Sequence, residues 1–392
     1  MMTTFTPLTH QPFSVGLAPI EQAPDGSWLV RGFSEARQIM LADVRQAGFK
    51  AEIIDDIPGY MTKPVLYQHG PTHREQRGQT SRFFTPTVVQ QRYMPLIEET
   101  VDRILGQFKQ AGRADLNHLT ALLATSVVAE VVGLTATPSS ALAGRLDRIL
   151  HADLKYEKSL MGFIRSTRVQ SFTLWFYLVD VLPAIRARRK APKEDVISYL
   201  ISKNYKNPEI LAECITYGAA GMVTTQEFIC VAAWHCLKDP ALKARMLNPE
   251  REVRYRLLHE ILRLEPVVGR LYRRAATDLQ IESGGASVTI PAGAMIDMDL
   301  GAINADARVV GAEPLDLNAD RPMEKGVPGS VMGFGSGPHR CAGEHIAIAE
   351  TDVFLQKLLA IPGLTIEKAP KLGHNDTIKG YELREFWLTI QG

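Results

Sequence analysis

Cys341 is the residue of this 392-residue chain whose surroundings most clearly indicate chemistry. It follows Gly335 and Gly337, precedes Gly343, and stands just before an apolar stretch with helical spacing. Glycines allow a backbone to wrap closely around the sulfur, so that amide N–H groups can point at it. A helix N-terminus adds positive potential, which lowers the pKa of a thiol. We therefore expect a loop that holds Cys341 as a thiolate.

Three uses of such a sulfur compete. A buried structural cysteine leaves the surrounding glycines unexplained. A nucleophile needs a base, and although His339 and His345 are near in sequence, no signature of an acyl-transfer family surrounds them. A metal ligand needs partners, and no second Cys/His pair completes a zinc site. A lone thiolate ligand points to a haem iron, whose other bonds come from the porphyrin.

The segment around the cysteine carries a specific motif. Residues 334–343 read Phe-Gly-Ser-Gly-Pro-His-Arg-Cys-Ala-Gly and resemble the haem-binding loop of the cytochrome P450 family at each defining position. The resemblance implies haem b as cofactor, Cys341 as axial ligand of its iron, and Phe334, Gly335 and Gly343 as parts of the haem-binding loop. It covers nearly the whole chain, from about residue 20 onward.

An acidic and a basic residue upstream have the spacing of a helical ion pair. Glu260 and Arg263 are three apart, so they share one helix face and can pair. Such a pair is more often a solvated surface contact. Here it resembles the Glu-x-x-Arg pair of the family, which pins the loop before the cysteine, and Arg321 resembles its third member. The resemblance implies a structural role, since a buried pair that loses one partner leaves an uncompensated charge.

A second pair has the spacing of an anion site. His73 and Arg77 are four apart on an expected helix, so both can reach the same anion. In an arbitrary sequence they would be a solvated basic face. In the family this pair binds the haem propionates, and Arg273 and His339 resemble the remaining partners. Four such donors would form charge-assisted hydrogen bonds with two carboxylates.

A glycine and two threonines interrupt the long apolar stretch over residues 208–238. A glycine such as Gly221 costs a helix interior about 1 kcal/mol relative to alanine. The hydroxyls of Thr224 and Thr225 can bond to a carbonyl one turn earlier and bend the helix. We expect a small polar groove, with close helix packing as the alternative. The resemblance implies that this groove serves oxygen activation, with Thr224 as its hydrogen-bond donor.

Val223 departs from the family pattern, which usually has Asp or Glu immediately before this threonine. That acid normally assists proton delivery. Glu227, three residues after Thr224, is the nearest carboxylate in the sequence. We predict that Glu227, or water held by Thr224 and Thr225, supplies protons.

The elements that must position these residues are mostly helical. Apolar spacing predicts helices over residues 93–111, 119–133, 195–202, 208–238, 252–264 and 343–359. Strand signals occur at residues 27–30, 279–290 and 381–390, whereas residues 301–333 predict a long ordered loop. Without repeats or composition breaks, residues 1–392 are expected to form a single mainly α domain with small β-sheets (α+β). The resemblance implies a triangular prism of helices around a buried haem.

The bulk composition excludes several classes. A chain with 45% hydrophobic and 22% charged residues is typical of a soluble globular enzyme. A formal net charge of +1 shows no footprint of a nucleic-acid partner. Four cysteines do not make a disulfide framework, and neither a signal segment nor an apolar span is evident. We expect a cytoplasmic protein without a membrane anchor.

The resemblance implies a haem-thiolate monooxygenase that hydroxylates or epoxidises a hydrophobic small molecule. The stretches expected to line its pocket are predominantly apolar: residues 57–67, 154–182, 267–271 and 378–381. Electrons from NAD(P)H would arrive through a separate ferredoxin or flavodoxin with its reductase, docked near Arg340. The alternatives are a P450-fold peroxygenase or oxidative coupling enzyme, and a non-catalytic haem-binding protein.

Overall fold

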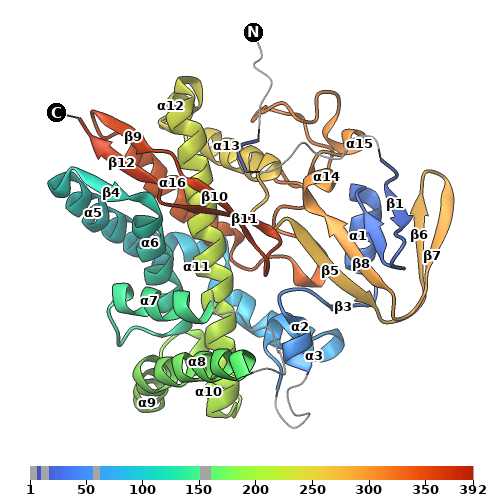
Figure 1. Ribbon diagram of the computed structural model, residues 1–392, viewed down its shortest axis with the longest axis horizontal. Helices are drawn as coiled ribbons and strands as arrows, with labels where there is room; N and C mark the ends of the chain where they lie inside the picture. The colour runs from blue at the N-terminus through green and yellow to red at the C-terminus, as the bar shows by residue number, and fades with distance from the viewer. Residues whose placement is uncertain (1–6, 10–16, 56–61, 151–159, 392) are drawn as a thin grey trace.

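The computed structural model describes residues 7–9, 17–55, 62–150 and 160–391, and most of them lie in helices (Figure 1). The helical segments are, in chain order, α1 (Phe33–Leu41), α2 (Ala51–Asp55), η1 (Val65–Tyr67), α3 (Gly70–Thr80), η2 (Ser81–Phe84), α4 (Pro86–Val88), η3 (Val89–Tyr93), α5 (Met94–Ala111), α6 (Leu116–Val132), α7 (Ser139–Leu150), α8 (Leu160–Phe176), η4 (Tyr177–Val181), α9 (Leu182–Lys190), α10 (Val196–Ser202), α11 (Asn207–Lys238), α12 (Pro240–Met246), α13 (Arg251–Leu264), α14 (Leu300–Asn304), α15 (Ala307–Val310), η5 (Gly337–His339) and α16 (Glu344–Leu359). Within these described ranges, no helix is both long and apolar enough to cross a bilayer.

Short strands form small sheets beside the helices. The strands are β1 (Ile20–Gln22), β2 (Trp28–Val30), β3 (Val44–Gln46), β4 (Arg113–Asp115), β5 (Arg270–Ala275), β6 (Leu279–Ser283), β7 (Ala286–Ile290), β8 (Met295–Asp299), β9 (Leu364–Lys368), β10 (Lys371–Asn375), β11 (Gly380–Arg384) and β12 (Trp387–Ile390). The largest sheet has the order β1-β2-β8-β5-β3, in which β2 and β8 run parallel and the other neighbours antiparallel. The expected mainly α fold with small sheets is confirmed.

The helix α11 is the axis of the molecule. Its 32 residues extend about 48 Å at 1.5 Å per residue, and Figure 1 shows it crossing the whole molecule. It is buried along most of its length because α6 packs on one side and α16 on another. Its apolar residues therefore do not form a single stripe, as expected for a helix that is surrounded by protein.

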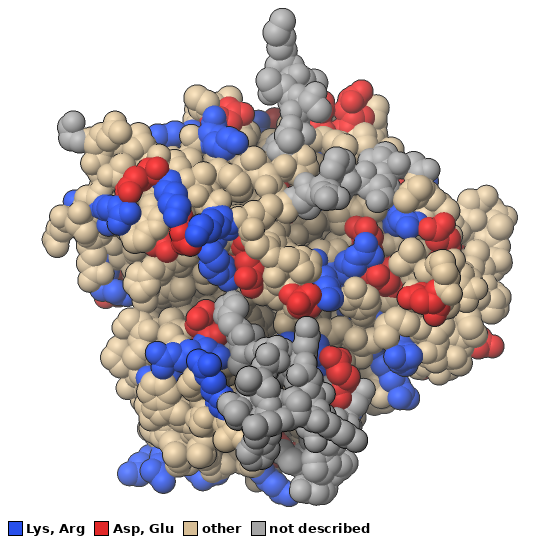
Figure 2. Space-filling view, viewed as in Figure 1, with Lys and Arg blue, Asp and Glu red and all other residues tan. Residues whose placement is uncertain are grey.

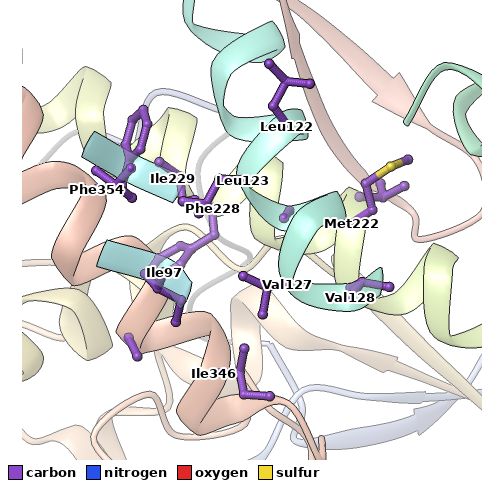
Figure 3. Packing of buried hydrophobic residues seen from close by; sticks show 14 of the residues in the cluster. Ile97, Leu122, Leu123, Val127, Val128, Met222, Phe228, Ile229, Ile346 and Phe354 are labelled. Carbon is purple, nitrogen blue, oxygen red and sulfur yellow. The ribbon is translucent and has the colours of Figure 1, made fainter. Parts of the chain in front are cut away.

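The main hydrophobic core lies where α5, α6, α11 and α16 meet. Ile97, Leu123, Val127, Phe228 and Ile346 come from these four helices and lie in one buried cluster (Figure 3). Close packing of this kind fixes the relative positions of the helices, because protein interiors are as dense as organic crystals. The first turn of α16, which directly follows Cys341, is thereby held against α11.

Two departures from the sequence prediction have local causes. The strand β5 was not expected because Arg273 occupies an inward position and hides the alternation of apolar residues. The helices α14 and α15 lie in the stretch expected to be a loop. Asp299 and Asp306 begin them by accepting hydrogen bonds from the backbone N–H groups of Ala302 and Arg308.

Candidate functional site

The loop that carries Cys341 is closed by its own backbone. The Cys341 N–H donates to the Phe334 carbonyl at 2.8 Å, and the Gly335 N–H donates to the Met332 carbonyl at 2.8 Å. Gly335 and Gly337 have φ values of 71° and 65°, in the region that favours glycine. These bonds set Cys341 at a fixed point just before α16.

The glycines of this loop serve different purposes. A Cβ at Gly337 would lie 2.4 Å from the Met40 carbonyl oxygen, so this glycine allows the loop to approach α1. A Cβ at Gly343 would lie 3.9 Å from the Cys341 sulfur. We expected the glycines of this loop to surround the sulfur. Of Gly337 and Gly343, only Gly343 lies next to it.

The Cys341 thiol differs from the expected low-pKa group. Burial raises the pKa of the thiol above its ordinary value, although the Gly343 amide and the Arg77 guanidinium act in the opposite direction. Yet the Cys341 side chain is exposed, unlike the other three cysteines of the chain. A side chain surrounded by protein but still accessible faces an internal hollow. Burial of the thiol therefore opposes the effect of the helix N-terminus on its pKa.

The structure brings His73, Arg77, Arg273 and His339 together. The rings of His73 (α3) and His339 (η5) stack with centroids 4.0 Å apart. Burial and neighbouring cations lower the pKa of His73 to about 4 and that of His339 to about 3. Burial also lowers the pKa of Arg273 to about 10. The four side chains predicted to share an anion therefore do lie in one place.

Arg273 shows what this cluster lacks. Its guanidinium donates to the Gln46 side-chain oxygen and to the Tyr272 carbonyl at 2.8 Å, while its Nε has no partner in the described part of the chain. No carboxylate of a described residue pairs with Arg273. A buried cation without an anion is costly. The haem propionates would supply that anion, so the residues fit the group.

The charge cluster predicted to be structural is present. Arg263 is fully buried and binds both oxygens of Glu260 at 2.7 Å. The Arg321 Nε lies 3.5 Å from a Glu260 oxygen, and the remaining Arg321 nitrogens donate to backbone carbonyls. Arg263 also donates to the carbonyl of Asn304 at 3.0 Å, and the Asn304 side chain accepts from the Met332 N–H at 2.9 Å. The cluster thus connects α13 to the segment that leads into the Cys341 loop.

The middle of α11 has an accessible face. Ala220 is exposed although it lies halfway along this central helix, and the Thr224 hydroxyl donates to its carbonyl at 2.6 Å. Thr225 is buried. A Cβ at Gly221 would lie 2.4 Å from a methyl carbon of Val128 in α6. Thr224 therefore lies beside this accessible face of α11, whereas Gly221 provides close packing against α6, which was the alternative to a groove.

Comparisons with known proteins agree with this geometry. Residues 177–361 match the family model described as Cytochrome P450. The chain is 25% identical over 356 residues to the Biotin biosynthesis cytochrome P450 of Bacillus subtilis, covering 86% of this chain and 84% of that protein. It is 26% identical to Nocardicin C N-oxygenase of Nocardia uniformis, covering 88% and 84%. The crystal structure of P450BioI in complex with hexadec-9Z-enoic acid ligated acyl carrier protein matches with a TM-score of 0.75 and 25% identity, over 95% of this chain and 94% of that one.

The chain belongs to the cytochrome P450 family. It is a cytochrome P450 monooxygenase, and its relatives include proteins named as oxygenases and hydroxylases. The family implies haem as the cofactor, in agreement with the buried Arg273, which has no carboxylate partner among the described residues. The crystal structure of CalO2, at a TM-score of 0.78 and 24% identity, supports the fold alone.

Glu227 does not have the position that proton supply in this P450 would require. It is fully buried, and its two oxygens accept hydrogen bonds from the Leu383 N–H at 2.8 Å and from the Arg384 guanidinium. Burial raises its pKa, although Arg384 opposes the shift. Both carboxylate oxygens are therefore hydrogen-bonded to residues of β11, and the prediction that Glu227 acts beside Thr224 was wrong. Sequence spacing could not reveal a partner 156 residues away.

The variant Glu227→Gln should lower stability and leave oxygenation intact. The amide retains the Leu383 contact but presents its NH2 group to Arg384, which should cost about 1–2 kcal/mol of unfolding free energy. Urea unfolding and product formed per NAD(P)H measure the two effects. The matched comparison is Thr224→Val, which removes the hydroxyl bound to the carbonyl of the exposed Ala220. If Glu227→Gln lowers the amount of product formed per electron as much as Thr224→Val does, Glu227 takes part in proton supply and this prediction is wrong.

The aromatic residues between 154 and 182, a stretch expected to line the substrate pocket, lie in different environments. Phe176 is fully buried in the core, whereas Trp175 is 41% exposed, and the guanidinium carbons of Arg145 and Arg148 lie 5.4 and 5.6 Å from the centroid of its ring. Tyr156 lies outside the described residues. The stretch from α8 to η4 therefore supplies core and surface residues, and periodicity alone could not separate them from a pocket lining.

Two adjoining hollows lie on the side of Cys341. One of about 320 Å³ reaches Arg77, Arg340 and Cys341, and the other of about 510 Å³ reaches Arg251 and His259. Pro86, Glu344 and His345 line both. On the face that Figure 2 shows, basic and acidic side chains are interspersed, in keeping with the small net charge.

Two buried acids were not anticipated from the sequence. Glu213 on α11 and Glu350 on α16 each have one carboxyl oxygen without a hydrogen-bond partner in the described ranges. Burial raises the pKa of Glu213 to about 7 and that of Glu350 well above its ordinary value. The sequence does show each of them as an acidic residue within a largely apolar helical stretch. Rules based on residue spacing do not single out such an isolated acid.

Proposed function

We propose that this P450 takes electrons from a separate redox partner and hydroxylates or epoxidises a hydrophobic small molecule. One observation carries the proposal: the buried Arg273 guanidinium has no carboxylate partner among the described residues, and it lies with His73 and His339 beside the loop that carries Cys341. Bound haem supplies the oxygen chemistry, in which a cysteine ligand favours O–O cleavage.

Each of these residues has a role in holding the group. The Cys341 sulfur is the proposed axial ligand. His73, Arg77, Arg273 and His339 are the proposed partners of the propionates. Ligation requires the deprotonated sulfur, and the Gly343 amide and Arg77 favour that form. Phe334 and Gly335 fix the loop through the backbone bonds of the Cys341 and Gly335 N–H groups.

Protons are proposed to arrive through the Thr224 hydroxyl. Val223 packs in the hydrophobic core, and Glu227 is bound to β11, so neither presents an acid beside this hydroxyl. A hydroxyl both donates and accepts, and it can rotate from the Ala220 carbonyl to a water on the accessible face of α11. Thr224 would thus pass on protons that solvent supplies.

The proposed substrate class follows from the apolar surroundings and from one relative. Val267 and Leu271 are buried within the stretch expected to line the pocket, as are Ile378 and Tyr381. The P450BioI structure holds a hexadec-9Z-enoic acid ligated acyl carrier protein. Both support a substrate with a long apolar part.

The redox partner is proposed to dock over the two hollows beside Cys341. Arg251, Arg340 and His345 lie around them, and positive side chains speed encounter with an acidic partner. A ferredoxin or flavodoxin has the required chemistry.

The test is the spectrum of the purified, reduced protein under CO. A strongly red-shifted Soret band is expected for a thiolate ligand. A band typical of histidine ligation, or a protein that binds no haem, would overturn the proposal. Comparing turnover driven by peroxide with turnover driven by NAD(P)H and a ferredoxin system then separates the monooxygenase from a peroxygenase.

A further inference from the structure

Two carboxylates one turn apart at the start of α11 hold the segment 62–68, which precedes α3. The Glu209 carboxylate accepts from the Thr62 N–H at 2.6 Å, and the Glu213 carboxylate accepts from the Val65 N–H at 2.9 Å. These bonds span 147 and 148 residues of sequence. The central helix therefore fixes the backbone of a segment expected to line the substrate pocket.

A buried network extends this contact into α3. The Gln76 amide donates to Glu213 at 2.6 Å, and the Gln76 side-chain oxygen accepts from Gln68 at 2.5 Å and from the Tyr205 hydroxyl at 3.1 Å. Gln68 also donates to the Lys63 carbonyl at 2.6 Å. Because α3 carries His73 and Arg77, the same network sets the helix that is proposed to hold the propionates.

The hydrogen-bond count within this network indicates a missing proton. One oxygen of Glu213 and the side-chain oxygen of Gln68 are buried acceptors without a donor among the described residues. The contacts of Glu213 in that part of the chain include no Lys or Arg side chain. A buried carboxylate without a cation is strongly disfavoured, whereas a neutral carboxyl group gains an O–H donor.

Glu209 provides the contrast within the same helix. Burial alone would raise its pKa, but hydrogen bonds from Thr62 and Lys206 lower the pKa below its ordinary value. Glu209 is therefore ionised at neutral pH, one turn from Glu213. A neighbouring negative charge adds to the cost of ionising Glu213.

We propose that Glu213 is a positioning residue that holds residues 62–68 against α11 as a neutral acid, and that its ionisation loosens this wall of the substrate pocket. The consequence for substrate rests on the proposed function, in which the segment lines the pocket. The loosening itself does not. Glu213 touches no reacting group, so it acts through the segment that it holds.

The direction of the pH effect follows from the raised pKa. Burial raises the pKa of Glu213 from 4.5 to about 7. A carboxyl group that binds its proton more tightly in the closed state than in the open state opposes closure as the pH rises between these two values. The contact is therefore strongest in acid, weakens up to about pH 7, and then levels off. The other titratable groups facing Glu213 are Glu209, Cys214, Tyr217, Tyr199 and Tyr205, of which the thiol and the phenols have raised pKa values and stay neutral in this range.

Amide hydrogen exchange of the haem-loaded protein without substrate tests the proposal. Protection of the Val65 amide, corrected for the intrinsic pH dependence of exchange, should fall about tenfold between pH 6 and pH 8. The variant Glu213→Gln keeps an acceptor and gains an uncharged donor, so it should retain the protection at both pH values. Glu213→Ala should lose the protection at both.

Glu209→Gln is the matched control. Because Glu209 is ionised throughout this range, its replacement should weaken protection of the Thr62 amide and leave the pH dependence at Val65 in place. Equal Val65 protection at pH 6 and pH 8 in the wild type would overturn the proposal. So would an unchanged pH dependence in Glu213→Gln.

Steady-state kinetics links the contact to substrate binding. The KM for a substrate should rise from pH 6 to pH 8 in the wild type and stay constant in Glu213→Gln, with kcat affected equally in both. A pH-dependent Val65 amide without this KM effect would show that the contact exists but that the segment does not line the pocket. That outcome places the failure in the proposed function and leaves the contact intact.

Discussion

Arg263→Ala should destabilise the folded protein by about 3–5 kcal/mol, because it leaves the Glu260 carboxylate buried without its partner. The side chain is fully buried and both Glu260 oxygens bind it at 2.7 Å. Folded domains are stable by only about 5–15 kcal/mol, so this one substitution removes a large share. We expect a lower midpoint of urea unfolding, followed by circular dichroism, and a reduced yield of folded protein.

The loss extends beyond the ion pair. Arg263 also donates to the carbonyls of Asn304 at 3.0 Å, Pro314 at 2.7 Å and Asp316 at 3.2 Å. A lysine has one ammonium group and cannot reproduce this fork of donors, so Arg263→Lys should be nearly as costly as Arg263→Ala. Replacing Glu260 and Arg263 together by apolar residues should cost less than Arg263→Ala, since no charge then stays unpaired.

Arg256 on the same helix is the matched control. Its side chain is 49% exposed and lies 3.3 Å from the exposed carboxylate of Asp320. Arg256→Ala should change the unfolding free energy by at most about 1 kcal/mol. If Arg263→Ala and Arg256→Ala unfold at the same urea concentration, the cluster is not a structural requirement.

The cluster of Glu260, Arg263 and Arg321 shows what residue spacing along the chain can and cannot predict. Glu260 and Arg263 lie three apart on one helix, and local geometry is enough to pair them. Their backbone partners in residues 304–316 depend on how a distant loop folds, which no local pattern encodes. The helices α5, α6, α11, α13 and α16 were predictable for the same reason, since apolar periodicity is a local signal. The strand β5 escaped because its inward Arg273 serves the site and breaks the pattern.

The residues of the candidate site show the same difference between local and long-range information. The proposed propionate partners and the Cys341 loop could be predicted from motifs, but the stacking of His73 on His339 joins parts of the chain far apart. Glu227 was predicted to act with Thr224 because the two are near in sequence, whereas in the folded protein Glu227 is hydrogen-bonded to β11. Glu213 was passed over because its partner Gln76 lies 137 residues away. Buried acids gain their function from tertiary neighbours, and those neighbours are absent from a local pattern.

Cys341→Ser should abolish the red-shifted Soret band of the reduced CO complex while the protein still folds. Serine has nearly the same shape, and the backbone bond of residue 341 to the Phe334 carbonyl does not involve the side chain. Haem retention should persist in part, because the cations around Arg273 still meet the propionates. Monooxygenase turnover should fall more than about 100-fold, since loss of a group outside the metal's own ligands already costs about 10–100-fold.

Cys236→Ala is the control that separates ligation from the general loss of a thiol. Cys236 is fully buried in α11 within the hydrophobic core, and burial raises its pKa to about 12, so it is an inert thiol. This variant should keep the red-shifted band and lose at most about 1–2 kcal/mol of stability from the cavity that it creates. A Cys341→Ser protein that retained the band would require another sulfur ligand. The other three cysteines are all buried, whereas Cys341 is exposed to the hollow. Persistence of the band would therefore contradict the placement of the haem against this loop.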